Sequence, residues 1–132
     1  MKADPVVHFE MPYEEKERMV KFYSKAFGWQ MQKLGEDMGN YVTAQTTETD
    51  KNNMVTVPGT INGGFYPKKA DFPAHYPSIV IAVEDIRRSM KKVTDAGGKL
   101  LGEPIAIPGI GDYVSFMDTE GNRVSLLQGK NK

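Results

Sequence analysis

Apolar residues after Pro12 recur with the period of an α-helix. In "EEKERMVKFYSKAFGW" the apolar positions lie three or four residues apart, and charged residues lie between them. Glu14 and Glu15 stand in the first turn, where the helix dipole favours acids, and Gly28 suits the end of the helix. The pattern predicts an amphipathic helix that packs on a sheet through one stripe, formed by Met19, Phe22, Tyr23, Ala26 and Phe27.

A second amphipathic helix is predicted after "PSIVIAVED". Ile86, Met90 and Val93 form its apolar stripe, and Ala96 or Gly97 extends it. Asp85 is the expected N-cap, and the Gly97–Gly98 pair ends the helix. The basic residues of this helix are expected on its solvated face.

Short runs with a period near two fill the rest of each half and predict strands. The turn at 118–122, with Asp118, Gly121 and Asn122, is a strong hairpin signal. The glycine-rich "PGIGD" could suggest a phosphate site, but no helix follows it, so a turn between strands is the simpler interpretation. The strand runs are "VVHFEMP", "WQMQKLG", "YVTAQTTET", "TINGGFYP", "PSIVIAV", "KLLGEPIAIPG", "DYVSFMD" and "NRVSLLQ".

The two halves of the chain share one order of elements: strand, helix, strand, strand, strand. A shift of 70 positions lays His8 on Ser78 and Gly28 on Gly98. Such self-similarity predicts a duplicated supersecondary unit. We expect one α+β domain with module 1 over about residues 5–66, a linker over 67–77 and module 2 over about 78–128.

Composition excludes several classes of function. The 132 residues contain no cysteine, which rules out disulfides, thiolate metal sites and cysteine nucleophiles. Lys and Arg equal Asp and Glu at 17 each, so the chain lacks the basic footprint of a nucleic-acid-binding protein. No run approaches the roughly 20 apolar residues of a membrane span, and "MKADPVV" is not a signal peptide. A soluble cytoplasmic protein with neither nucleic acid nor membrane as a partner is expected.

Several segments together resemble the vicinal oxygen chelate superfamily, the glyoxalase, bleomycin-resistance and extradiol-dioxygenase group. They are "FYSKAFGW", "INGGFYP", "IAVEDI", "AGGKLL" and "PGIGDYVSFMDTEGNRVSLLQ", and the resemblance covers about residues 5–128. The nearest branch is the poorly characterised one related to lactoylglutathione lyase. The resemblance implies paired βαβββ modules curled around a central cleft, and a homodimer.

Enzymes of this superfamily bind one divalent metal through side chains on the first and last strand of each module. The resemblance places these ligand positions at His8, at Gly63 or Gly64, at Ser78 and at Ser125. Serine hydroxyls are poor ligands for such metals, glycine has no side chain, and one imidazole cannot hold a catalytic metal. We therefore expect no metal and no other cofactor.

An atypical metal site remains the alternative. His8 would hold Mn, Fe, Ni or Zn together with recruited ligands, for which Glu10, Gln128, Glu103 and His75 are the candidates. Glu10 lies two residues from His8 and so shares its face of the strand. The protein would then be a lyase, an isomerase or a dioxygenase of the superfamily.

The favoured hypothesis is a binding protein of the bleomycin-resistance kind, which holds an unidentified small molecule in a metal-free cleft. Further aromatic candidates for such a pocket are Phe9, Trp29, Tyr41 and Phe116, although core packing explains each of them as well. A chain whose pocket is filled by side chains and which only dimerises is a third possibility. The residues expected to line the pocket are His8, Gly63, Phe65, Ser78, Tyr113 and Ser125.

Catalysis without metal is also open. His8 and Glu10 are the only candidate catalytic residues, and His8 could act as a general base near neutral pH with Glu10 or Tyr113 as its partner. Such a pair would support proton transfer of the isomerase or epimerase kind. A buried histidine that bonds to a serine hydroxyl and does no chemistry is the competing interpretation.

Overall fold

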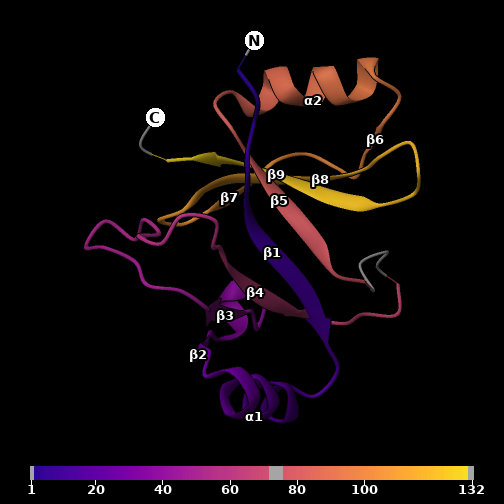
Figure 1. The fold of residues 1–132 in the computed structure, drawn as a ribbon. Helices are drawn as coiled ribbons and strands as arrows, with labels where there is room; N and C mark the ends of the chain where they lie inside the picture. Colours follow the sequence, from indigo (N-terminus) through magenta and orange to yellow (C-terminus); the bar gives the residue numbers. More distant parts are fainter. Residues whose placement is uncertain (1, 72–75, 131–132) are drawn as a thin grey trace. The chain divides into compact units, whose positions relative to one another are not determined.

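The computed structural model describes residues 2–71 and 76–130, which form two compact units (Figure 1). His8–Pro77 is called the α1 unit, after its helix α1 (Lys16–Phe27). Met1–Val7 and Ser78–Lys132 make up the α2 unit, after helix α2 (Ile86–Asp95).

In its described residues, the α1 unit is a four-stranded sheet with one α-helix. β1 (Val6–Tyr13) runs parallel to β4 (Asn62–Pro67), and β4 pairs antiparallel with β3 (Val42–Gln45). β3 pairs antiparallel with β2 (Gln30–Lys33), and a short 3-10 helix, η1 (Glu36–Met38), lies between these two strands in sequence. The register places Glu10 beside Gly64, and this alignment determines which side chains share a face.

Helix α1 packs on one face of this sheet through a stripe that differs from the predicted one. Met19, Val20 and Tyr23 pack against the buried cluster, whereas Phe22 and Phe27 are 57% and 64% exposed. The expectation that both phenylalanines lie in the inner stripe was therefore wrong. The 3.6-residue period fits the set 19, 20 and 23 equally well. Of the two outer rings, Phe22 lies edge-on to both Tyr23 and Phe27.

The α2 unit repeats the arrangement with an additional strand. β5 (Ser78–Val83) runs parallel to β9 (Arg123–Gly129), and β9 pairs antiparallel with β8 (Gly111–Met117). β6 (Lys99–Leu100) and β7 (Ile105–Ile107) both pair with β8, so the predicted run "KLLGEPIAIPG" divides into two strands. The amide of Ala82 donates to the carbonyl of Pro5, which ties the N-terminal segment to β5.

Helix α2 has the predicted cap, and Val93 packs against the same cluster as Ile86 and Met90. Ala96 and Gly97, which were expected to extend this stripe, are exposed beyond the end of the helix, so that part of the prediction was wrong. The side chain of Asp85 accepts from the amide of Arg88 at 3.1 Å, and Ile86 and Met90 are buried against the sheet. The α+β class and the βαβββ order of both halves are confirmed, with β7 as the one short addition. The sheet residues that complete this core are Val83, Val114, Phe116, Val124 and Leu126.

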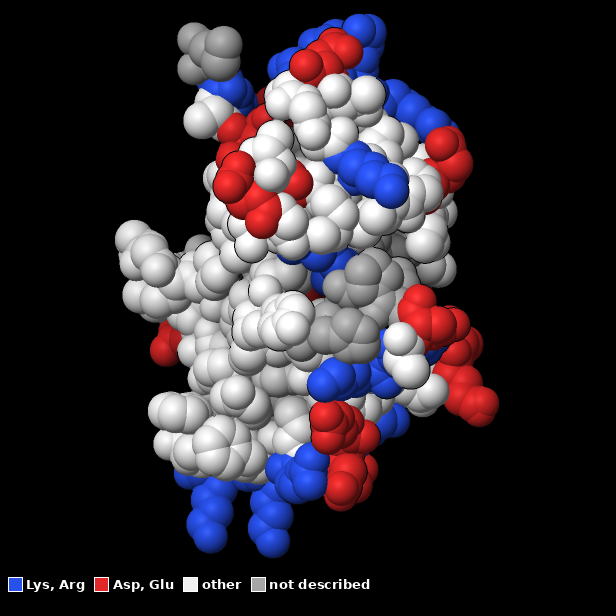
Figure 2. All heavy atoms as spheres, turned by 90° about the vertical axis from the view of Figure 1, so that its right-hand side faces the viewer, with Lys and Arg blue, Asp and Glu red and all other residues white. Residues whose placement is uncertain are grey.

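The surface has no dominant charge where it is seen in Figure 2, since basic and acidic side chains are interspersed over that face. This agrees with the balance of 17 basic and 17 acidic residues. Within residues 2–71 and 76–130, neither helix has the length and apolar character that crossing a membrane requires.

Candidate functional site

Strand β1 separates its side chains into a polar face and a core face. Phe9 and Met11 turn toward α1 and join the apolar cluster there. His8 and Glu10 alternate with them and lie on the opposite face of the sheet. This face, called the polar face of the α1 unit, carries mostly hydrogen-bonding side chains. By register its members are His8, Glu10, Gln30, Gln32, Tyr41, Thr43, Gln45, Asn62 and Gly64.

A tyrosine hydroxyl joins the two candidate acid–base residues of the polar face. The hydroxyl of Tyr41 donates to Oε2 of Glu10 at 3.0 Å and lies 3.1 Å from Nε2 of His8. Glu10 is only 6% exposed, although it carries a carboxylate. Buried carboxylates require hydrogen-bond donors, so Tyr41 stabilises Glu10 and holds His8 at the same time.

The hydrogen bonds of Tyr41 determine the tautomer of His8. A phenol has one proton, and here it is donated to Glu10. Nε2 of His8 must therefore be protonated and donate to the hydroxyl oxygen of Tyr41. In a neutral ring the lone pair then lies on Nδ1. Burial lowers the pKa of His8, and the nearby Glu10 opposes this shift more weakly. A neutral His8 thus offers Nδ1 as a hydrogen-bond acceptor or a base.

The lowered pKa of His8 predicts that stability falls as the solution becomes mildly acidic. The unfolded chain takes up its proton near pH 6.5, before the folded protein does, so the free energy of unfolding should decrease as pH falls below that value. The slope for one such group reaches at most about 1.4 kcal/mol per pH unit. Urea denaturation between pH 7.5 and pH 5 measures it.

His8→Gln is the matched variant for this measurement. Glutamine retains an N–H for Tyr41 but does not titrate, so the difference in stability between the two proteins should vanish or reverse toward pH 5. His75 is present in both proteins and cancels in the difference. Hydrogen bonds with Asn122 lower the pKa of Asp118. Its titration affects stability only below about pH 4, outside the range of pH 7.5 to pH 5 used in this measurement. Parallel profiles for the two proteins would contradict the lowered pKa of His8.

Two residues that the sequence assigned to the pocket lie on the other face of the α1 unit. Phe65 is 1% exposed and packs in the apolar cluster beneath α1. A side chain on Gly63 would overlap the ring of Phe9 on that same face. A side chain on Gly64 would instead overlap the hydroxyl and ring of Tyr41. Of the two glycines, Gly64 is therefore the one beside His8 and Glu10.

The α2 unit has its own polar cluster, which unites three of the predicted site residues. Tyr113 accepts from Oγ of Ser125 at 2.7 Å, and Ser115 lies 2.8 Å from the same Oγ. Arg123 donates through Nη1 to Ser78 at 3.1 Å and through Nη2 to Tyr113 at 3.0 Å. Ser78, Tyr113 and Ser125 thus belong to one hydrogen-bonded network.

Arg123 and Ser115 are the members of this network that the sequence did not single out. Arg123 stands two residues before Ser125 in "NRVSLLQ", and strand alternation puts both on one face. Ser115 pairs directly with Ser125 across β8 and β9, a register that the hairpin turn at 118–122 determines. Alternation and the turn were the signals that could have found them.

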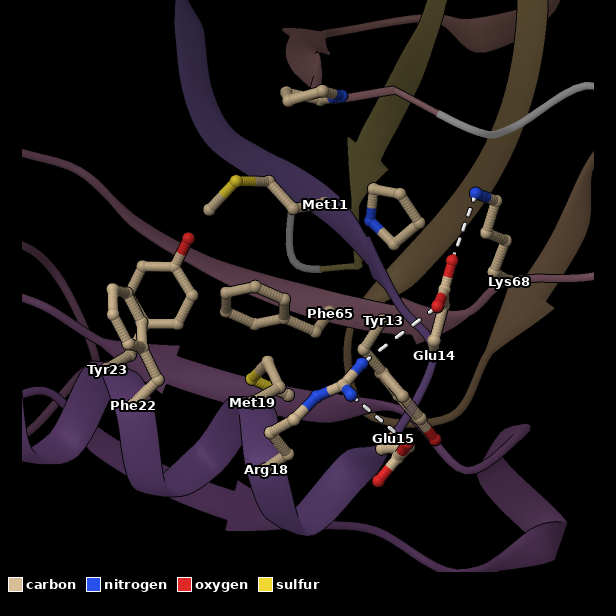
Figure 3. Close-up of a pocket in the computed structure, with 12 residues that line it drawn as sticks. Met11, Tyr13, Glu14, Glu15, Arg18, Met19, Phe22, Tyr23, Phe65 and Lys68 are labelled. Atoms are coloured by element: carbon tan, nitrogen blue, oxygen red, sulfur yellow. Dashed lines mark hydrogen bonds and ion pairs between the residues drawn. The ribbon is translucent and has the colours of Figure 1, made fainter.

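A separate groove of about 500 Å³ opens beside α1, on the core side of the sheet (Figure 3). Met11, Met19 and Phe65 turn toward one another along it, and Phe22 and Tyr23 extend it (Figure 3). Ion pairs line one end: Glu14 to Lys68 at 3.3 Å, and Arg18 to Glu15 at 3.1 Å. The groove contains rings, methionines and paired charges but neither His8 nor Glu10, so it is not the acid–base site.

The side chains described do not fit the metal that the fold family implies. Among residues 2–71 and 76–130 no three His, Asp or Glu side chains are grouped so that they could hold an ion. Gln128 accepts from the amide of Ile86 at 2.8 Å and so caps α2, and Glu103 pairs with Arg87 at the surface. His75 lies outside the described residues. His8 and Glu10 remain, held by Tyr41.

Comparison with known proteins agrees with this fold. Residues 6–126 match the model of the Glyoxalase/Bleomycin resistance protein/Dioxygenase superfamily, and the chain belongs to this family. A glyoxylase-like domain-containing protein from Didymella fabae is 33% identical over 116 residues, covering 86% of this chain and 84% of that protein. The lactoylglutathione lyase of Oryza sativa subsp. japonica is 27% identical over 132 residues, and the match spans only 44% of its length.

Solved structures show the same fold at low sequence identity. A methylmalonyl-CoA epimerase in complex with methylmalonyl-CoA and NH4+ superposes with a TM-score of 0.71 at 14% identity, covering 98% of this chain and 97% of that one. Hypothetical protein BH1468 from Bacillus halodurans C-125 gives 0.68 at 13% identity, covering 99% and 98%. These likenesses establish the glyoxalase-like fold.

Proposed function

We propose that this protein binds a small polar organic molecule on the polar face of the α1 unit, without a metal. The observation that carries the proposal is the chain from Glu10 through Tyr41 to His8, which leaves the lone pair of His8 on Nδ1. In the part of the chain that the structure describes, Tyr41 is the hydrogen-bond partner of His8, through Nε2. A ligand that donates an O–H or N–H to Nδ1 suits this arrangement.

The chemistry of the surrounding side chains narrows the class of ligand. Gln30, Gln32 and Gln45 are exposed on the same face and offer both amide donors and amide acceptors. Such a surface suits a hydroxyl-bearing or amide-bearing molecule better than a purely apolar one. The homodimer and the cytoplasmic location expected from the sequence stay predictions.

A thermal-shift screen of small polar compounds, in the presence of EDTA, tests the proposal. A ligand that binds only the folded protein raises its melting temperature by mass action. We expect the shift to persist with the chelator and to be lost in His8→Gln, which keeps the bond to Tyr41 but lacks the acceptor at Nδ1. Phe22→Ala, in the groove beside α1, is the matched control and should retain the shift. A shift lost in Phe22→Ala but kept in His8→Gln would place the ligand in the groove and refute the proposal.

A lyase or isomerase is the second candidate function. The neutral His8 with its lowered pKa is suited to act as a general base, and two relatives are named lactoylglutathione lyase and probable lactoylglutathione lyase. An enzyme of this kind would turn over the ligand found in the screen, and His8→Gln would abolish turnover. Turnover that EDTA removes and added Zn, Ni or Mn restores would favour the metal-dependent form over the metal-free one.

A further inference from the structure

Gly64 on β4, the last strand of the α1 unit, is equivalent to Ser125 on β9, the last strand of the α2 unit. Glu10 pairs with Gly64 in the α1 unit, and Val80 pairs with Ser125 in the α2 unit. Glu10 and Val80 are 70 positions apart, the shift that superposes the two halves, so Gly64 is the counterpart of Ser125. This is the last-strand position at which the family resemblance leads one to expect a metal ligand.

The space that a ligand side chain at position 64 would need is already filled. A Cβ added to Gly64 would overlap the hydroxyl and two ring carbons of Tyr41. The same hydroxyl lies within hydrogen-bond distance of both His8 and Glu10. Glycine at 64 and tyrosine at 41 are therefore coupled, because the ring can reach His8 and Glu10 only if position 64 has no side chain.

We propose that Tyr41 and Gly64 act as a pair that closes the metal position of the α1 unit. His8 and Glu10 are held by a tyrosine hydroxyl in place of a cation, and a third ligand cannot enter from β4. This inference deepens the proposed function, since it names the residues that make the polar face independent of metal. It concerns the α1 unit alone and requires no knowledge of the ligand.

A double-mutant cycle tests the coupling of the two residues. In the natural background, Gly64→Ala forces the Tyr41 ring to move and breaks its bonds to His8 and Glu10, so the melting temperature should fall by several degrees. A Tyr41→Ala background lacks the three atoms that lie nearest to the added methyl, so most of that loss should disappear. Equal losses in both backgrounds would overturn the proposal.

Gly63→Ala is the matched control for this cycle. It is the adjacent glycine, but its added methyl would overlap Phe9 on the opposite face. Its effect on the melting temperature should be unchanged by Tyr41→Ala, since the two side chains lie on different sides of the sheet. A cost at Gly63 that Tyr41→Ala relieves as strongly as the cost at Gly64 would indicate general loosening of the sheet and count against a specific pair.

Metal uptake supplies the second test. The double variant Tyr41→Ala with Gly64→Glu places a carboxylate beside Glu10 and His8, which gives three potential ligands of the kind that divalent metals accept. We expect it to bind Zn²⁺ or Co²⁺ at least tenfold more tightly than Tyr41→Ala with Gly64→Ala, by calorimetry and, for Co²⁺, by its visible spectrum. Adding His8→Ala should abolish the gain.

The outcomes separate this inference from the proposed function. Stoichiometric uptake by the natural protein, lost in His8→Ala, would refute both the closed metal position and a metal-independent function. Absence of a gain in the glutamate variant, despite a native circular dichroism spectrum, would refute the closed position alone. If the glutamate variant does not fold, the alanine cycle decides the matter by itself.

Discussion

Replacing Phe65 by alanine is expected to lower the free energy of unfolding by about 3–5 kcal/mol. The ring is 1% exposed and lies 5.1 Å from the ring of Tyr23 and 6.5 Å from that of Phe9, measured between centroids. Its removal would leave a cavity at the centre of the cluster that joins α1 to the sheet. Urea denaturation, monitored by the fluorescence of the single tryptophan, Trp29, measures the loss.

Phe22→Ala is the control for the prediction at Phe65. The ring of Phe22 is 57% exposed and packs edge-on against Tyr23. Its removal should cost less than about 1 kcal/mol, because most of its surface is already in water. If both substitutions cost the same, Phe65 does not have the core role assigned to it here. A loss below about 1 kcal/mol at Phe65 would contradict its place in the buried cluster beneath α1.

The order of elements was predictable because local signals mark the ends of the helices and one hairpin. Asp85 caps α2, Gly28 ends α1 in a left-handed conformation, and Asp118 accepts from the amides of Glu120 and Asn122 in the turn before β9. Each of these signals involves residues close together in the chain, so propensity and turn chemistry are sufficient to locate it. The family resemblance agreed with the same boundaries.

Which face a strand residue occupies was harder to predict, because it depends on how each strand aligns with its neighbour. Gly63 and Gly64 are equivalent in the sequence, and only the pairing of Gly64 with Glu10 shows which of them faces His8. Tyr41 appeared as one of several aromatic candidates. Its role as the partner of two polar residues requires β3 and β1 to lie on either side of β4.

The polar cluster of the α2 unit was hard to predict from the sequence for the same reason. Ser78 and Ser125 were singled out because the resemblance expected metal ligands at these positions. Arg123, which donates to Ser78, was not singled out, because the two residues are 45 positions apart and only the fold brings them together. The structure replaces a set of isolated serines with a network of hydroxyls around one guanidinium, and that network depends on the register of β8 with β9.

Gly111 lies where β8 closely approaches β9, and Gly111→Ala is expected to cost about 2–6 kcal/mol in the free energy of unfolding. Its φ angle is 148°, and an added Cβ would overlap the backbone carbonyl oxygen of Gln128 on β9. A backbone carbonyl cannot move aside as a flexible side chain can, so β8 and β9 would have to separate locally. The glycine of "PGIGD" thus serves close strand approach, in agreement with the interpretation of this segment as a turn between strands.

Gly109→Ala, two residues earlier, is the control that separates the carbonyl contact from the effect of backbone conformation. The φ angle of Gly109 is 78°, and an added methyl there would meet no atom within 4 Å. Its free energy of unfolding should therefore fall by only about 1–2 kcal/mol, the cost of a left-handed conformation for a residue with a side chain. Gly111→Ala should also weaken the amide-exchange protection of Tyr113 and Leu127, which face each other two pairs further along β8 and β9. Equal costs at the two glycines, with protection unchanged, would show that Gly111 does not set the alignment of β8 with β9. The positions of Tyr113 and Ser125 would then depend on the hairpin turn at 118–122 and on the hydroxyl network.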